Sequence, residues 1–220
     1  MKPAQNLRAL LDRRGLAVMP ASFDALSARL IASAGFEVQF MSGFAVSGAR
    51  LAQPDAGLIT LPEMLDTLRN ICAASSIPVI GDGDTGFGNA INVQRTVFEY
   101  ARAGAAGVMI EDQVSPKKCG HTPGKRVIGR EDARMKMRAA VEAARANDIL
   151  VLARTDARAV VSFDEALMRC AMFVEEGADI IFLEAPESTE EMRAFCAAIP
   201  KPCMANMVIG GKTPVLGPRE

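Results

Sequence analysis

The segment that decides the fold, RAGAAGVMIED, runs from Arg102 to Asp112. It passes from the end of a helix through small residues into a short apolar run, and it finishes in two acids. The same order of residues recurs in SAGFEVQFMSG at 33–43 and in EEGADIIFLEA at 175–185. Short apolar runs that alternate with amphipathic helices are typical of parallel strands buried on both faces. The repeat therefore predicts a βα unit used several times.

Seven such apolar runs follow one another along the chain and are separated by helical patterns. The predicted strands are Leu16–Ala21, Val38–Met41, Ile77–Ile80, Val108–Ile110, Ile149–Ala153, Ile180–Leu183 and Pro202–Ala205. Capping boxes, such as Thr60 with Glu63 and Ser162 with Glu165, mark helix starts between them. One continuous series of βα units favours an α/β fold of the (β/α)8 TIM-barrel type over an open doubly wound sheet. We expect a single barrel domain over 1–220, in which the eighth strand is lacking.

The composition limits the possible partners. The 220 residues carry a net charge of −1, with no Trp and one Tyr, so neither a basic patch nor a base-stacking platform for nucleic acid is expected. The polar N-terminal segment reads as an amphipathic helix, and no apolar run approaches membrane-spanning length. The five cysteines contain no CxxC pair. We expect a cytoplasmic protein that binds neither nucleic acid nor a membrane.

Polar residues follow nearly every predicted strand, where the active sites of barrels assemble. These residues are Ser42, Gly43, Asp82, Asp84, Glu111, Asp112, Arg154, Asp156, Glu184 and Asn206. Acids so close together repel one another unless a cation lies among them, and hard oxygen ligands suit Mg²⁺ or Mn²⁺. In GDGDTGFG at 81–88, strand alternation would turn both acids to one side as metal ligands. The alternative is that they cap the next turn and helix.

Arg154 ends an apolar strand, and a buried guanidinium needs an anion. Two partners are open: a carboxylate of the substrate, or an internal salt bridge to Glu184 or Asp156.

A long segment without helical or strand period follows the acids at 111 and 112, and we expect a mobile lid at about 113–130. It contains Cys119 and the only histidine of the chain, His121. Lys117 and Lys118 beside the thiol would lower its pKa and prepare it for proton transfer. The alternative is an inert cysteine and an ordinary loop histidine.

Together these residues resemble the isocitrate lyase/phosphoenolpyruvate mutase superfamily, and most of all its branch of 2-alkylmalate lyases and oxaloacetate hydrolases. The matching stretches are MSG at 41–43, GDGDTGFG at 81–88, IEDQ at 110–113, PKKCGH at 116–121, ARTDAR at 153–158, LEAPE at 183–187 and ANMVIGGKTP at 205–214. They cover almost the whole chain. The family continues beyond this sequence with an eighth strand and C-terminal helices that swap between the subunits of a tetramer, so a homo-oligomer is expected.

The resemblance implies a Mg²⁺-dependent C–C lyase or hydrolase that acts on a small 2-hydroxy or 2-oxo dicarboxylate, such as a 2-alkylmalate or oxaloacetate. Asp82 and Asp84 would hold the metal, with Glu111 in support. Cys119, aided by His121, would protonate the enolate-like intermediate. The implied substrate-binding residues are Ser42, Gly43, Phe44, Gly120, Arg154, Glu184, Asn206 and Thr213.

Two departures from family patterns narrow this expectation. Isocitrate and methylisocitrate lyases carry a Tyr two residues before the Ser of the SG motif, where this chain has Phe40, which argues against both activities. Phosphoenolpyruvate-type mutases lack the Cys-Gly-His lid that is present at 119–121. Three alternatives stay open: a carboxyphosphonoenolpyruvate-type phosphomutase, an oxaloacetate decarboxylase, and a truncated, inactive barrel that only binds dicarboxylates.

Overall fold

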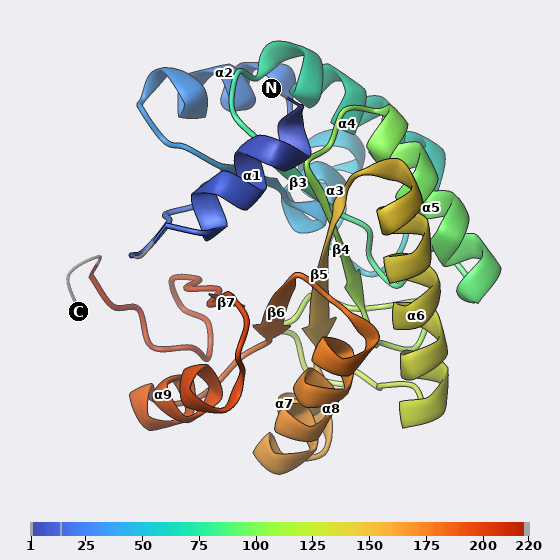
Figure 1. Cartoon of the computed structure of the whole chain (residues 1–220), viewed down its shortest axis with the longest axis vertical. Coiled ribbons are helices and arrows are strands. Elements are labelled where there is room, and N and C mark those ends of the chain that lie inside the picture. Colours follow the sequence, from blue (N-terminus) through green and yellow to red (C-terminus); the bar gives the residue numbers. More distant parts are fainter. Residues whose placement is uncertain (1, 14, 218–220) are drawn as a thin grey trace.

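The computed structural model describes residues 2–13 and 15–217, and there the chain forms a curled parallel sheet surrounded by helices (Figure 1). The strands are β1 (Ala21–Ser22), β2 (Gln39–Met41), β3 (Val79–Asp82), β4 (Gly107–Glu111), β5 (Leu150–Thr155), β6 (Ile180–Leu183) and β7 (Cys203–Met204). The helices are α1 (Pro3–Leu11), α2 (Ala25–Ser33), α3 (Gly43–Leu51), α4 (Leu61–Ala74), α5 (Ala90–Arg102), α6 (Arg130–Asn147), α7 (Ala157–Val160), α8 (Phe163–Glu176) and α9 (Thr189–Ala198).

The strands pair in chain order from β1 to β7, and every pairing is parallel. Within the described residues β1 and β7 are the two edges of the sheet, so the barrel is open there. This confirms the α/β barrel class. Residues 1, 14 and 218–220 of the predicted domain lie outside the described residues. No helix in the part of the chain that the structure describes is long and apolar enough to span a membrane.

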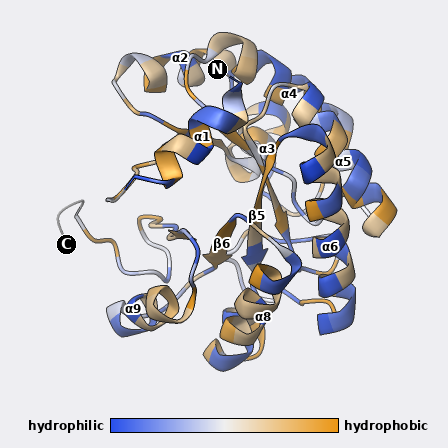
Figure 2. Cartoon of the chain, in the orientation of Figure 1, coloured by the Kyte–Doolittle hydropathy of each residue, from blue (hydrophilic) through white to orange (hydrophobic). Residues whose placement is uncertain are grey.

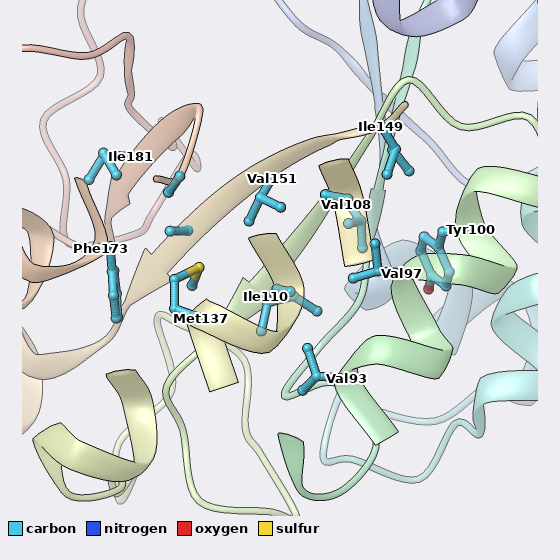
Figure 3. Packing of buried hydrophobic residues seen from close by; sticks show 14 of the residues in the cluster. Val93, Val97, Tyr100, Val108, Ile110, Met137, Ile149, Val151, Phe173 and Ile181 are labelled. Carbon is cyan, nitrogen blue, oxygen red and sulfur yellow. The ribbon is translucent and has the colours of Figure 1, made fainter. Parts of the chain in front are cut away.

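The sheet separates two apolar layers. The outer layer lies between the strands and the helices and includes Val93, Val97, Tyr100, Val108, Ile110, Met137, Ile149, Val151, Phe173 and Ile181 (Figure 3). The inner layer includes Val38, Ile80, Met109, Leu150, Leu152, Ile180 and Phe182, together with Ala4 and Leu7 of α1. Successive strand residues point to opposite faces, so β4 sends Val108 and Ile110 outward and Met109 inward. Helix α1 thus packs against the inner layer.

The helices are amphipathic, and Figure 2 shows hydrophobic and hydrophilic residues on each of α5, α6 and α8. At the start of α4 the backbone N–H of Thr60 donates to Glu63 Oε2 at 2.8 Å, as the capping box predicts. At the start of α8 only half of the predicted box forms. Ser162 Oγ accepts from the N–H of Glu165 at 3.1 Å, but the Glu165 carboxylate binds Arg169 instead of returning to the cap.

Two local predictions are wrong. The strand expected at 16–21 is reduced to β1, and Leu16 and Val18 are 73% and 49% exposed, so this apolar run does not enter the sheet. The segment after Gly43, for which no helix was predicted, is helix α3. The backbone turns directly from β2 into this helix, because Ser42 Oγ accepts from the N–H of Ala45 at 3.3 Å and caps it.

Candidate active site

The polar residues at the carboxyl ends of four central strands continue the inward face of the barrel. Each lies two positions after an apolar residue of the inner layer, and residues two apart in a strand face the same side. The pairs are Ile80 with Asp82, Met109 with Glu111, Leu152 with Arg154, and Phe182 with Glu184. The sheet register also places Glu111 beside Arg154 on neighbouring strands. The same alternation that builds the core therefore brings Asp82, Glu111, Arg154 and Glu184 together at the carboxyl end of the barrel, which we call the mouth.

Arg154 is the centre of the mouth. Its guanidinium binds Asp156 through two hydrogen bonds, Nε to Oδ2 at 2.8 Å and Nη2 to Oδ1 at 3.0 Å. It also lies 3.2 Å from Glu111 Oε2 and 3.3 Å from Glu184 Oε2, so the predicted internal salt bridges are confirmed. Burial lowers the pKa of Arg154, but the three carboxylates outweigh it and leave the pKa well above its usual value. The guanidinium is therefore a fixed positive charge.

The two acids of the GDGD motif come together by a turn. Strand β3 ends at Asp82, and Asp84 has a left-handed backbone with φ of 48°, so strand alternation is the wrong reason for their proximity. Asp82 Oδ1 accepts from the N–H of Asp84 at 3.0 Å, and Oδ2 accepts from the N–H of Gly43 at 3.0 Å. A Cβ at Gly43 would lie 2.7 Å from Asp82 Oδ2 and 3.4 Å from Asp84 Oδ1. Any larger residue at position 43 would overlap the Asp82 carboxylate.

Burial dominates the protonation of two acids of the mouth. It raises the pKa of Asp84 to about 7, with the Asp82 charge adding to the effect and Lys117 opposing it. It also raises the pKa of Glu111 well above its usual value, although Arg154 opposes the shift. Glu111 Oε1 is buried and meets no hydrogen-bond partner among the described residues. The mouth thus holds carboxyl oxygens that are available to a ligand.

The predicted lid lies over the mouth and is tied to it by cations. Lys117 Nζ lies 2.7 Å from both Asp55 Oδ2 and Asp84 Oδ1. Lys125 Nζ lies 2.6 Å from Asp156 Oδ1 and also binds the carbonyl of Gly120. Lys125 and Asp55 were not predicted from the sequence, and Lys117 was considered only as a neighbour of the thiol. The signal for the two lysines was a lysine-containing segment that follows an acidic strand end, and Asp55 had no such signal.

His121 joins the lid to β6 and to the segment after β7. Its Nε2 lies 2.9 Å from Glu184 Oε1, and its Nδ1 accepts the backbone N–H of Lys212 at 3.2 Å. Because Nδ1 accepts, a neutral ring carries its proton on Nε2, facing the carboxylate. Asn206 Nδ2 is 3.4 Å from Nε2. Thr213 is 3% exposed, and its Oγ1 meets no partner in the ranges described.

Gly120 lies directly on the mouth. A Cβ built there would be 2.5 Å from Arg154 Nη2 and 2.6 Å from Glu184 Cδ. The next residue back, Cys119, is half-buried, and its N–H donates to the carbonyl of Asp55 at 3.1 Å. Phe44 lies on α3 with its side chain 59% exposed. The structure therefore brings most predicted site residues to one place and leaves Phe44 at its outer side.

The charge of the mouth fits a divalent cation. Among the described residues, six buried carboxyl groups and three basic side chains lie at the mouth; the acids are Asp55, Asp82, Asp84, Glu111, Asp156 and Glu184, and the basic residues are Lys117, Lys125 and Arg154. No group of three His, Cys, Asp or Glu side chains in residues 2–13 and 15–217 forms a preassembled cage. Mg²⁺ usually takes one or two carboxylates and completes its coordination shell with water and substrate oxygens. Asp82 and Asp84 could supply the carboxylates.

Comparisons with known proteins agree with this geometry. The family model described as phosphoenolpyruvate phosphomutase matches residues 7–217. The chain is 46% identical to 2,3-dimethylmalate lyase of Eubacterium barkeri over 98% of this chain and 75% of the relative. It is 49% identical to 2-methylisocitrate lyase of Aeropyrum pernix over 98% of this chain and 69% of the relative.

Solved structures give the same result. Oxaloacetate acetylhydrolase in complex with the inhibitor 3,3-difluorooxalacetate superimposes with a TM-score of 0.96 at 38% identity, over 99% of this chain and 75% of that one. Phosphonopyruvate hydrolase in complex with oxalate and Mg²⁺ superimposes with a TM-score of 0.82 at 36% identity, over 92% and 71%.

Proposed function

Because the chain belongs to the phosphoenolpyruvate phosphomutase family, in the superfamily of phosphoenolpyruvate mutase and isocitrate lyase, we propose that it is a Mg²⁺-dependent lyase or hydrolase of carbon–carbon bonds. Its substrate would be a small 2-hydroxy or 2-oxo dicarboxylate, a 2-alkylmalate or oxaloacetate. One observation carries the proposal: Gly120 of the lid lies directly against Arg154 and Glu184, with Cys119 next to it in the chain. This contact brings the backbone of the lid to the guanidinium and the Glu184 carboxylate, and it supports a role of the neighbouring Cys119 in the reaction.

Asp82 and Asp84 would hold Mg²⁺, or Mn²⁺ in its place, and the unpartnered oxygen of Glu111 would support it. When bound, the ion stabilises negative charge that develops on the substrate oxygens during bond cleavage.

The protein residues supply binding and proton transfer. Arg154 binds a substrate carboxylate with the N–H groups that its internal partners leave available, since a guanidinium has five donors. At the end of β2, the backbone of Gly43 and the hydroxyl of Ser42 would contact the substrate. Asn206 and Thr213, in the segment after β7, would line the side of the substrate site next to that segment. Phe44 lies at the outer side of the mouth, and its role in substrate binding rests on the resemblance alone.

The reaction breaks one carbon–carbon bond and leaves an electron pair on the carbon next to a carboxylate. The S–H of Cys119 gives its proton to that carbon. With a 2-alkylmalate, the 2-hydroxyl gives its proton to solvent, pyruvate is the second product, and solvent returns a proton to the Cys119 thiolate. With oxaloacetate, water first adds to the ketone, and oxalate and acetate result. His121 holds the lid for this step through Glu184 and the backbone of Lys212.

Substrate entry requires the 113–130 segment to open, because Lys117 and Lys125 tie it to acids of the mouth. Closure then restores these ion pairs and excludes bulk water from the intermediate. We further expect a cytoplasmic homo-oligomer, a tetramer as the resemblance implies, and light scattering after size-exclusion chromatography measures this.

The test is a ¹³C NMR time course of purified protein with Mg²⁺ and either oxaloacetate or 2,3-dimethylmalate. The proposal predicts oxalate with acetate from the first, or pyruvate with propionate from the second, and no product after chelation of the metal. Pyruvate and CO₂ from oxaloacetate would indicate a decarboxylase. Absence of product from both compounds would contradict the proposed substrate class.

A further inference from the structure

A second cluster of buried charges lies next to the mouth and has no role in the reaction described above. Its centre is Asp112, which follows β4 and is 2% exposed. Asp112 Oδ1 accepts the backbone N–H of Asp156 at 2.9 Å. Asp112 Oδ2 accepts the hydroxyl of Thr155 at 2.7 Å and Nη1 of Arg169 at 2.9 Å. Both carboxylate oxygens are therefore engaged in holding the end of β5 and helix α8.

The cluster continues to the base of the lid. Arg169 Nε donates to Glu165 Oε1 at 2.8 Å, one helical turn earlier on α8. Glu165 also receives a forked pair of hydrogen bonds from Arg130, the first residue of α6, where the lid joins that helix. Because its carboxylate binds these arginines, Glu165 does not accept a hydrogen bond from the backbone N–H of Ser162, the second bond of the predicted capping box. A continuous chain of ion pairs thus connects the base of the lid to Asp112.

Stability does not account for the buried pair of Asp112 and Arg169. Taking two charges out of water costs several kcal/mol per ion, and apolar residues of similar volume often stabilise a buried site as well or better. Arg169 and Asp112 are 4% and 2% exposed, so both bear that cost. What the pair provides instead is position. It fixes the peptide group of Asp156, whose side chain is the shared partner of Arg154 and Lys125.

We propose that Asp112 and Arg169 are positioning residues that set the guanidinium of Arg154 for the substrate carboxylate, an inference that rests on the proposed function. The bidentate contact between Arg154 and Asp156 depends on geometry, because a fork of two N–H groups must meet two oxygens. If the Asp156 backbone moves by a fraction of an ångström, the guanidinium of Arg154 turns with it, and the N–H groups that remain for the substrate point in the wrong direction. Asp112 and Arg169 themselves do not touch substrate.

The experiment compares three variants, Arg169→Met, Arg169→Lys and Asp112→Asn, with the control Arg134→Met. Arg134 of α6 pairs with Glu175 and Glu176 at the end of α8 and, among the described residues, makes no ion pair with the cluster. Calorimetry measures the affinity for Mg²⁺ alone and for oxalate in the presence of Mg²⁺. Arg169→Met and Asp112→Asn should weaken oxalate binding about tenfold, the size of one lost hydrogen bond to a charged group, and raise KM more than they lower kcat. Mg²⁺ affinity and the control should not change, and Arg169→Lys should recover part of the loss.

Oxalate affinity equal to that of the wild type in both Arg169→Met and Asp112→Asn would overturn the inference. If the wild type itself binds no oxalate, the proposed function fails. The position of Arg154 is then followed by NMR of its side-chain Nε–H group, independently of any ligand. The arginine Nε–H signal that disappears in Arg154→Lys should shift and exchange faster with solvent in Arg169→Met but not in Arg134→Met. An unchanged signal would refute the positioning role. Should Arg169→Met not fold, Asp112→Asn, which keeps the shape of the side chain, carries the same two measurements.

Discussion

Replacement of Gly120 by alanine tests whether the lid lies on the mouth as described. The added Cβ would be 2.5 Å from Arg154 Nη2, 2.6 Å from Glu184 Cδ and 2.7 Å from Glu184 Cγ. These side chains cannot move aside freely. Arg154 is held by Asp156 and Glu111, and Glu184 is 0% exposed beside His121. The lid must therefore lift.

The expected size of the effect follows from this overlap. Forcing an extra methyl group into a packed site costs about 1–3 kcal/mol. That energy corresponds to a shift of about 5- to 150-fold toward the open lid, and affinity for a ligand that needs the closed lid falls by the same factor. Because opening of the proposed lid would be a local event, the unfolding midpoint of the barrel should change little.

The assay is calorimetric titration of oxalate with Mg²⁺ present, together with limited trypsin digestion of the lid, which contains several Lys and Arg residues. Gly129→Ala is the matched control: it lies at the other end of the same segment, where the nearest described atom to an added Cβ is Asp132 Oδ2 at 3.9 Å. We expect Gly120→Ala to lose oxalate affinity and to be cut faster, and the control to do neither. Oxalate affinity of Gly120→Ala within twofold of the wild type would refute this placement of the lid.

Two further predictions concern residues behind the mouth. Tyr100, the only tyrosine, donates from its hydroxyl to the carbonyl of Asp82 at 2.6 Å, so Tyr100→Phe leaves a buried carbonyl unpartnered. Urea denaturation should show a loss of about 1–3 kcal/mol in unfolding free energy, and calorimetry should show weaker Mg²⁺ binding; unchanged values in both would contradict a supporting role. Hydrogen bonds from Arg130 lower the pKa of Glu165 from 4.5 to about 2, so its stabilising effect is complete above pH 4.5 and is lost as the pH falls through 2. Glu165→Gln should therefore be less stable than the wild type at pH 7, by a difference that shrinks between pH 4.5 and 2; a difference independent of pH would argue against this ion pair.

Much of the site could be predicted because one local rule produces it. The polar residues at the strand ends continue the two-residue period of the apolar residues before them, as in Met109 and Glu111, so strand assignment also placed the side chains. Gly43 was predicted from its place at a strand end and Gly120 from the resemblance, and the structure gives the reason for glycine at both: a Cβ at either position would overlap side chains of the mouth.

The remaining features depend on where the lid folds back, which no local pattern encodes. Lys117 meets Asp55 across 62 positions of sequence, and Arg169 meets Asp112 across 57. The capping box predicted at Ser162 forms only in part for the same reason, because Arg130, 35 positions earlier in the sequence, competes for the carboxylate of Glu165. Local propensity also missed α3, whose glycines disfavour a helix until the cap at the end of β2 begins it.

The central claim is that Cys119 delivers a proton during carbon–carbon cleavage at this mouth. The most direct measurement is the turnover number of Cys119→Ala with the substrate that the NMR assay identifies, with the affinity for oxalate and Mg²⁺ measured on the same preparation. Cys196→Ala, which alters an exposed thiol on α9, is the control. A positioned acid contributes about 10²- to 10⁴-fold, so turnover should fall by at least 10²-fold in Cys119→Ala while oxalate affinity and the control are unchanged. Turnover of Cys119→Ala equal to that of the wild type would contradict the account.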